Sequence, residues 1–195
     1  PKHILCRNAA YTLGVSEEAI EEHLLEMMIE KKIVIKEEDE VRIYGAAQYH
    51  MEVNTARMLC DLNLSYDVSI SEIETTIGRI EEAEQITFAE KQKEAIEAIA
   101  SHSIVVLTGG PGTGKTTTIN GMIQYFETEG LDIRLAAPTG RAAKRMTEAT
   151  GYEAMTIHRL LELNGEAKEE MDRMGMAFER NAANPLETDV IIIDE

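Results

Sequence analysis

The sequence has no tryptophan, only two cysteines and only four prolines in 195 residues. Cys6 and Cys60 lie far apart, with no CxxC or histidine-rich spacing around them. This spacing excludes a disulfide framework and gives no indication of a zinc site. We expect both cysteines to be small core residues, because free cysteine is among the most frequently buried residue types.

Long apolar runs are also missing. None approaches the roughly 18 residues that a transmembrane helix needs, and no charged and apolar leader opens the chain. We therefore expect a cytoplasmic protein with no membrane partner. The hydrophobic content of 44% and the charged content of 28% are typical of globular chains. A chain of this length accommodates one medium domain or two small ones, each with its own core.

Basic residues are scarce, because 19 Lys and Arg stand against 36 Asp and Glu, which gives a net charge of -17 at pH 7. A surface this acidic does not attract nucleic acid over a broad face. DNA binding would therefore require a local groove lined with basic side chains or backbone amides.

Residues 1–83 predict a small α+β domain. Residues 16–31 place apolar side chains at helical spacing behind a Ser16 N-cap, and residues 33–45 indicate two short strands around an acidic turn. A helix followed by a hairpin favours a winged-helix-like unit. A further helix is expected over residues 46–62, whose apolar side chains are predicted to lie in the core: Met51, Met58, Leu59 and Leu62.

Winged helices often bind DNA, but six glutamates line the presumed helix of residues 16–31 and would repel phosphates. We expect this domain to pack against other parts of the protein or to contact a protein partner, with DNA binding as the alternative. A polar and acidic stretch at residues 70–86 indicates the domain junction, which we place after residue 83.

Residues 84–195 predict an α/β domain. Thr87 with Glu90 forms a capping-box signature at the start of a helix. Strands are expected over residues 104–108 and 133–137, separated by a glycine loop and an amphipathic helix. This order is typical of a βαβ unit with parallel strands.

A further helix is expected from Arg141. Residues 164–188 then form a long polar connection, and an apolar strand is expected over residues 190–193. The second part of the chain is therefore predicted to contain a parallel sheet with helices on its faces.

The glycine loop GGPGTGKT, residues 109–116, fits the pattern GxxxxGK[ST] and lies between a predicted strand and a predicted helix. Its glycines allow backbone N–H groups to wrap a β-phosphate, and the helix N-terminus adds its dipole. Lys115 would reach the β- and γ-phosphates, and the Thr116 hydroxyl would bind Mg²⁺. A glycine turn without a ligand would leave the lysine unexplained. The predicted nucleotide-binding residues of the loop are Gly110, Pro111, Gly112, Thr113, Gly114, Lys115, Thr116 and Thr117.

The segment DVIIIDE, residues 189–195, ends in two carboxylates after four apolar residues. Ligands of parallel α/β sheets bind at the carboxyl ends of the strands. Asp194 would hold Mg²⁺ through water together with Thr116, and Glu195 would orient or deprotonate the attacking water. The predicted catalytic residues are Lys115, Asp194 and Glu195.

Together with APTGRAAKRMTEATGYEAMTIHRLL at residues 137–161, these motifs resemble the RecD-like branch of superfamily one DNA helicases, the exodeoxyribonuclease V alpha-subunit type. The stretch FAEKQKEAI resembles the Q motif of that family. The resemblance implies a P-loop RecA-like motor domain behind a small N-terminal domain. It also implies ATP and Mg²⁺ as cofactors, single-stranded or duplex-end DNA as the partner, and 5′ to 3′ unwinding in recombination or repair.

The resemblance assigns further residues. Gln92 would read the adenine, since an amide offers one donor and one acceptor to the base edge; the alternative is a surface glutamine. His158 either touches DNA or caps and packs. The match to motif Ia, which grips single-stranded DNA, covers Pro138, Thr139, Gly140 and Arg141. Arg141 and the basic residues after it form a compact cluster suited to phosphate contact, or else a solvated helix face.

The resemblance also implies that a second RecA-like domain follows in cis and supplies an arginine finger, worth ~10³ to 10⁵ in turnover. The chain alone should therefore hydrolyse ATP poorly. In RecA-like sheets the strand between residues 104–108 and residues 190–193 comes later in the sequence. We therefore expect an incomplete sheet with a gap of about two strand spacings, filled by another chain or poorly ordered.

Two other functions fit the same motifs. A conjugative relaxase-helicase shares the motor, and a relaxase domain upstream would favour it. A non-catalytic nucleotide-binding or partner-docking module would bind nucleotide without DNA-stimulated hydrolysis.

Overall fold

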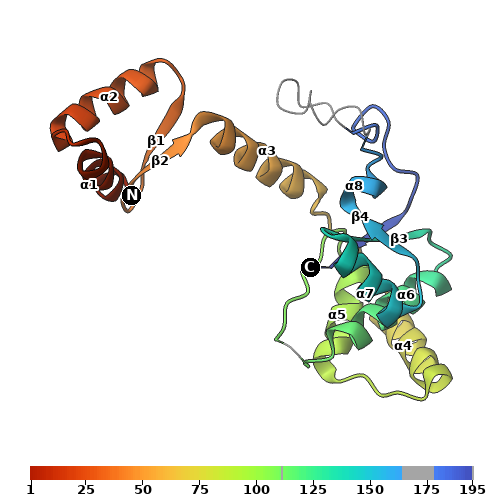
Figure 1. Ribbon diagram of the computed structural model, residues 1–195. Coiled ribbons are helices and arrows are strands. Elements are labelled where there is room, and N and C mark those ends of the chain that lie inside the picture. The colour runs from red at the N-terminus through yellow and green to blue at the C-terminus, as the bar shows by residue number, and fades with distance from the viewer. Residues whose placement is uncertain (111, 164–177, 195) are drawn as a thin grey trace. The chain divides into compact units, whose positions relative to one another are not determined.

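The computed structural model describes residues 1–110, 112–163 and 178–194. The chain divides into two compact units, Pro1–Leu64 and Ser65–Glu195 (Figure 1). This division falls earlier than the boundary that the sequence predicts after residue 83. The reason is helix α4, Ile70–Glu84, which packs against two helices of the second unit. Among the described residues, no helix combines the length and the apolar character that crossing a bilayer would require.

The first unit contains α1 (Lys2–Leu13), α2 (Glu17–Ile29), the strands β1 (Ile33–Glu37) and β2 (Val41–Gly45), and α3 (Ala46–Leu62). The predicted Ser16 cap is confirmed, because its hydroxyl accepts a hydrogen bond from the Ala19 N–H at 3.3 Å. The predicted hairpin is also confirmed as an antiparallel pair. The buried core consists of Cys6, Leu24 and Ile33.

Helix α3 has the predicted bounds, but the prediction that its apolar side chains lie in the core is wrong. Met51, Met58, Leu59 and Leu62 are between 51% and 65% exposed. The helix contacts the hairpin, where the ring of Tyr49 lies 5.6 Å from that of Tyr44, and then extends past it (Figure 1). Its later turns therefore gain no cover from the rest of Pro1–Leu64. Cys60, on this helix, is exposed against expectation, whereas Cys6 is buried as expected.

The second unit contains a parallel sheet with strand order β4-β3-β5. Strand β3 (Ile133–Ala137) is central, with β4 (Ala154–Thr156) on one side and β5 (Val190–Ile193) on the other. Leu135 lies opposite Ala154 on one neighbour and opposite Ile192 on the other. The structure thus confirms the predicted α/β class and parallel pairing. After α4, the second unit contains the helices α5 (Glu90–Ser101), α6 (Lys115–Thr128), α7 (Gly140–Thr150) and α8 (Ile157–Leu160).

Helix α6 takes part in two buried clusters. With α4 and α5 it encloses an apolar cluster that consists of Ile73, Ile77, Ile80, Phe88, Ile96, Met122 and Tyr125. With β3 and α7 it encloses a second cluster, made of Ile119, Ile123, Leu135 and Met146. Because α6 is packed on both sides, the glycine loop at its N-terminus is held on a fixed element.

The strand predicted over residues 104–108 does not form. Val106 is 81% exposed, and this segment joins no ladder among the described strands. A strand requires a hydrogen-bonded neighbour about 4.8 Å away. A cleft of about 800 Å³ instead separates residues 105–109 from Val190–Ile193, with Ile119, Met122 and Phe126 among its lining residues. The expected gap in the sheet is therefore present.

The start of α5 also differs from its prediction. The helix begins at Glu90 and its N-cap is Ala89, so the predicted capping box of Thr87 with Glu90 is wrong. The side-chain oxygen of Gln92 instead accepts a hydrogen bond from the Ala89 N–H at 2.8 Å. The predicted polar connection lies partly outside the described residues, since residues 164–177 are not described.

Candidate nucleotide site

The glycine loop enters α6 through left-handed backbone conformations. Gly112 has φ 76° and Gly114 has φ 83°, values that only glycine adopts without strain. Gly114 is the N-cap residue of α6, so the first backbone N–H groups of this 14-residue helix face the loop. Pro111, also assigned to the site, lies outside the described residues.

The side chain of Lys115 folds back onto the glycine loop. Its ammonium donates hydrogen bonds to the backbone carbonyls of Gly109 and Gly110, at 2.5 Å and 3.3 Å. The Thr113 hydroxyl donates to the same Gly110 carbonyl at 2.8 Å. A phosphate oxygen is a stronger acceptor than a neutral carbonyl, so the ammonium can exchange these partners for an anionic ligand. The loop therefore has the chemistry of an anion-binding cradle.

The hydroxyls that follow the lysine have different environments. Thr116 and Thr117 are exposed, whereas Thr118 is buried and its hydroxyl donates to the Gly114 carbonyl at 3.0 Å. Thr118 thus fixes the first turn of α6. Thr116 remains accessible, as a metal-binding hydroxyl must be.

Gln92 lies against the loop. Its amide nitrogen donates to the Gly114 carbonyl at 3.2 Å, while its oxygen accepts from Ala89. Gln92 is half-buried and both ends of its amide are engaged. The alternative of a surface glutamine therefore does not describe it, and the reading of adenine stays a prediction.

Glu81 holds the chain where it enters α5. Its carboxylate accepts from the Phe88 N–H at 2.7 Å and pairs with Lys93 at 3.0 Å. The hydrogen bond from Lys93 and that from the Phe88 backbone hold the pKa of the Glu81 carboxyl below its ordinary value. Sequence reasoning did not single out Glu81, because its partners lie 7 and 12 residues away.

Asp194 follows β5 at the carboxyl edge of the sheet. Its N–H donates to the Ala136 carbonyl at 3.1 Å, which continues the pairing with β3. Asp194 and Thr116 line one pocket, so the structure brings the two predicted Mg²⁺ ligands together. Glu195 lies outside the described residues.

Within residues 1–110, 112–163 and 178–194, no three His, Cys, Asp or Glu side chains gather as a metal cluster. A cation beside Asp194 would therefore complete its shell with the Thr116 hydroxyl, water and phosphate oxygens. This donor set fits Mg²⁺, which keeps waters and takes few protein ligands.

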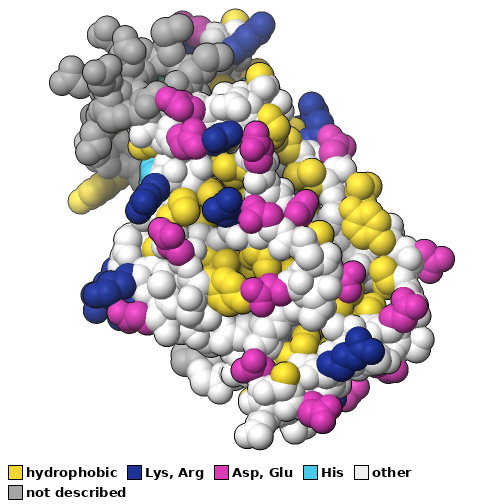
Figure 2. Space-filling model, turned by 90° about the vertical axis from the view of Figure 1, so that its right-hand side faces the viewer, with side chains coloured by type: hydrophobic (Ala, Val, Ile, Leu, Met, Phe, Trp, Pro, Cys, Tyr) yellow, Lys and Arg dark blue, Asp and Glu magenta, His cyan; other side chains and the backbone are white. Residues whose placement is uncertain are grey.

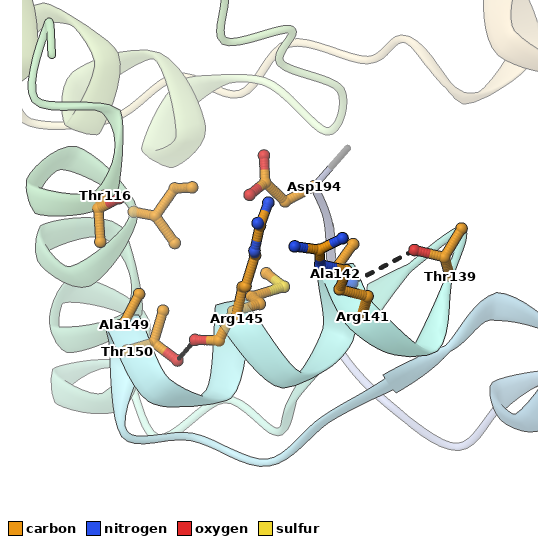
Figure 3. A pocket seen from close by; sticks show the side chains of 10 residues that line it. Thr116, Thr139, Arg141, Ala142, Arg145, Ala149, Thr150 and Asp194 are labelled. Carbon is orange, nitrogen blue, oxygen red and sulfur yellow. Dashed lines mark hydrogen bonds between the residues drawn. The ribbon is translucent and has the colours of Figure 1, made fainter. Parts of the chain in front are cut away.

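The pocket that contains Thr116 and Asp194 has a volume of about 470 Å³ and lies between α6 and α7 (Figure 3). Arg141 and Arg145 of α7 extend into it toward Asp194. Helix α7 is capped by Thr139, whose hydroxyl accepts from the Ala142 N–H at 3.2 Å. The structure thus places Arg141, which the sequence assigns to DNA, on the same pocket as the predicted metal ligands.

Of the other residues assigned to DNA, all of them exposed, Thr139 also lines that pocket, whereas Pro138, Gly140 and His158 do not. Pro138 and Gly140 flank Thr139 at the carboxyl end of β3, and His158 lies on α8 with its ring 6.2 Å from that of Phe178. On the face shown in Figure 2, basic side chains are interspersed with acidic ones and form no broad patch. The alternatives for His158 therefore stay open.

A glycine loop closed around a lysine, next to a carboxylate at the end of a parallel strand, is the arrangement of phosphate-loop nucleotide-binding proteins. The sequence pattern of the family described as "AAA domain" matches residues 92–195, just over half of the chain. The chain therefore belongs to this family, and membership implies nucleotide binding.

Known relatives confirm the resemblance to RecD-like helicases. The chain is 41% identical to the ATP-dependent RecD2 DNA helicase of Deinococcus radiodurans over 107 residues, covering 55% of this chain and 14% of the relative. It is 37% identical to the RecBCD enzyme subunit RecD of Mycolicibacterium smegmatis over 129 residues, which cover 54% of this chain and 22% of the relative. The identity to the RecBCD enzyme subunit RecD of Haemophilus influenzae is 32% over 167 residues, which cover 73% of this chain and 24% of the relative. The chain thus matches at most about a quarter of the length of these relatives.

Proposed function

We propose that this chain carries the front part of the motor of an ATP-dependent 5′ to 3′ DNA helicase that acts in recombination or repair. One observation carries the proposal: Thr116 and Asp194 line one pocket at the first turn of α6, directly after the glycine loop whose carbonyls Lys115 contacts. The similarity to proteins named as RecD and RecD2 supports the assignment of this nucleotide site to a helicase.

ATP and Mg²⁺ are the proposed cofactors. Lys115 would neutralise the β- and γ-phosphates, and Thr116 and Asp194 would hold a Mg²⁺ ion, which would supply positive charge to the phosphates. Glu195 orients or deprotonates the attacking water. Gln92 selects adenine through its amide, exchanging its internal partners for the base edge.

Single-stranded DNA is the proposed polymer substrate. Pro138, Thr139, Gly140 and Arg141 are exposed at the carboxyl end of β3 and lead into the N-terminus of α7, an arrangement that suits contact with backbone phosphates. His158 is proposed as a further contact. A helix with Glu17 and Glu18 in its first turn disfavours phosphate contact, so we assign a protein partner, rather than DNA, to the N-terminal unit.

Unwinding is a property that we assign to a longer protein containing this chain. A second motor domain in cis closes the nucleotide cleft and supplies an arginine finger, so the chain alone hydrolyses ATP slowly. The cleft between residues 105–109 and β5 supports a longer protein, because it leaves apolar residues such as Ile191 and Ile193 exposed where a further strand of the sheet would lie.

The test is the steady-state ATPase rate of a protein that extends this chain to the length of its RecD relatives, measured with and without single-stranded DNA. A helicase motor gives a rate that rises on addition of DNA. An equal rate with and without DNA contradicts the helicase and favours a non-catalytic or regulatory nucleotide-binding module.

A further inference from the structure

Helix α7 has three cationic side chains in its first two turns, and they differ in what they face. Arg141 and Arg145, four residues apart, lie on the side that lines the pocket with Thr116 and Asp194. Lys144 does not line this pocket; it is 79% exposed and lies 3.8 Å from Glu148. The helix therefore separates two pocket-facing guanidiniums from one outward-facing ammonium.

Arg145 is aimed at the pocket by a well-anchored backbone. Its neighbour Lys144 does not line the pocket, whereas Met146 lines it and is buried in the cluster that joins α7 to α6 and β3. Figure 3 shows the Arg145 side chain extended from α7 toward the carboxylate of Asp194. Packing thus fixes the helix that carries Arg145, while the arginine side chain itself is exposed.

Within the described residues, Arg145 forms no ion pair, although several other basic side chains of this unit do. Lys93 pairs with Glu81, Arg134 with Asp132, and Arg180 with Glu162. In a chain with 36 acidic and 19 basic residues, carboxylate partners are plentiful. Asp194 likewise forms no ion pair among described residues, which leaves its carboxylate available to a cation.

The position of the pocket indicates which end of a bound nucleotide would face it. Thr116 and Asp194 are the residues that would hold the proposed Mg²⁺ ion, and the charge of such an ion would be used at the terminal phosphates. Gln92, on α5, contacts the loop at Gly114 and does not line this pocket. The side toward α7 is therefore the γ-phosphate side, away from the proposed adenine contact.

We propose that Arg145 donates hydrogen bonds to the terminal phosphate of the bound Mg²⁺–nucleoside triphosphate. Lys115 and Arg145 then approach the phosphates from the loop and from α7. A planar guanidinium suits this task because it offers two parallel donors to phosphate oxygens. This inference rests on the nucleotide site of the proposed function and adds a specificity residue to it.

The consequence is discrimination between triphosphate and diphosphate. Arg145→Ala removes contacts to the γ-phosphate and leaves those to the β-phosphate, which Lys115 and the loop amides supply. We expect calorimetry in Mg²⁺ to show binding of the β,γ-imido analogue of ATP weakened about 10- to 100-fold, and ADP binding changed by less than about twofold. Arg145→Lys keeps the charge but not the paired donors, so its loss for the analogue should be intermediate.

Lys144→Ala is the matched control, because it removes a cation from the same helix without touching the pocket. It should leave both affinities unchanged. Equal effects of Arg145→Ala and Lys144→Ala would overturn the inference, as would equal weakening of analogue and ADP by Arg145→Ala. Loss of single-stranded DNA binding by Arg145→Ala with unchanged nucleotide affinity would also overturn it.

Lys115→Ala separates this inference from the site on which it rests. If Lys115→Ala abolishes binding of both nucleotides while Arg145→Ala behaves like Lys144→Ala, the nucleotide site stands and the role of Arg145 fails. If Lys115→Ala binds both nucleotides as the unmodified chain does, the site fails and the role of Arg145 fails with it.

Discussion

The side-chain amide of Gln92 connects the N-cap residue of α5 to the N-cap residue of α6. It accepts from the Ala89 N–H at 2.8 Å and donates to the Gly114 carbonyl at 3.2 Å. The proposed adenine-reading residue is therefore joined to the phosphate loop by a direct hydrogen bond.

Gln92→Glu tests this connection with an almost unchanged side-chain shape. The variant keeps an acceptor for Ala89 but loses the donor to Gly114 and to a base. We expect its preference for ATP over GTP to fall by about tenfold, because an amide–base hydrogen bond contributes roughly 1 kcal/mol or more in a desolvated site. Competition binding with the two nucleotides measures this ratio, and an unaltered ratio would remove Gln92 from adenine recognition.

Gly121 of α6 is required by packing. A Cβ placed there would lie 2.6 Å from Cζ of Phe88 and 3.1 Å from Cδ1 of Ile96, both of them buried. Gly121→Ala should therefore lower the free energy of unfolding by about 1–3 kcal/mol, despite the better helix propensity of alanine.

Gly78 of α4 supplies the matched control, since a Cβ there would meet no atom within 4 Å. Gly78→Ala should raise the free energy of unfolding by up to about 1 kcal/mol. Urea unfolding of both variants measures the contrast. Changes of the same sign would show that the packing around Phe88 is looser than described.

The ionisation of Glu81 should make the free energy of unfolding depend on pH. Its pKa is lowered in the folded chain by Lys93 and by the Phe88 N–H, so the ionised form stabilises the fold. That contribution is complete above the unfolded pKa and is lost as the pH falls through the lower folded pKa. At pH 7, Glu81→Gln should cost about 1 kcal/mol of unfolding free energy, and the cost should shrink as the pH falls below the ordinary pKa.

Glu82→Gln is the control on the same helix, because Glu82 is exposed. Chemical denaturation at neutral and acidic pH compares the two variants. A cost of Glu81→Gln that does not change with pH would mean that the ionised carboxylate is not what holds Phe88 and Lys93.

Arg141 tests the proposed DNA contact. Arg141→Ala should weaken single-stranded DNA binding similarly for all sequences and reduce the salt slope by about 1. Arg134→Ala provides a control at the opposite end of β3, since Arg134 is already paired with Asp132 at 3.3 Å. Fluorescence titration over a range of salt measures the slopes. A slope equal to that of the unmodified chain would assign Arg141 to the nucleotide pocket alone.

The local parts of the fold follow from local signals. Apolar spacing and caps predicted the hairpin and α3, because these depend on neighbours in sequence, and apolar runs predicted the strands of residues 133–137 and 190–193, which pair with each other. The exposure of Met51 and Met58 on α3 was not predictable, since a helical apolar stripe does not reveal whether a partner covers it. The strand of residues 104–108 failed for the same reason, because a strand requires a neighbour that is not among the described strands.

The features of the site that are contiguous in sequence were likewise predictable, and those that depend on distant residues were not. The pattern GxxxxGK[ST] predicted the loop around Lys115 because the chemistry is contiguous in sequence. The contacts that position it are not contiguous: Gln92 meets Gly114 across 22 residues, and Glu81 meets Lys93 across 12. The pocket between α6 and α7 depends on how the helices pack, so the sequence offered only DNA contact or a solvated helix face for the basic cluster after Gly140. An isolated glycine within the α6 pattern was the available signal for Gly121.

The proposed function depends on the loop around Lys115, which we expect to bind the phosphates of Mg²⁺–ATP. Calorimetric titration of the chain with ATP in Mg²⁺, comparing Lys115→Ala with Lys91→Ala, tests it most directly, since Lys91 is an 85% exposed lysine paired with Glu94. We expect Lys115→Ala to abolish measurable binding, while Lys91→Ala binds as the unmodified chain does. Equal affinity of Lys115→Ala and the unmodified chain would contradict it.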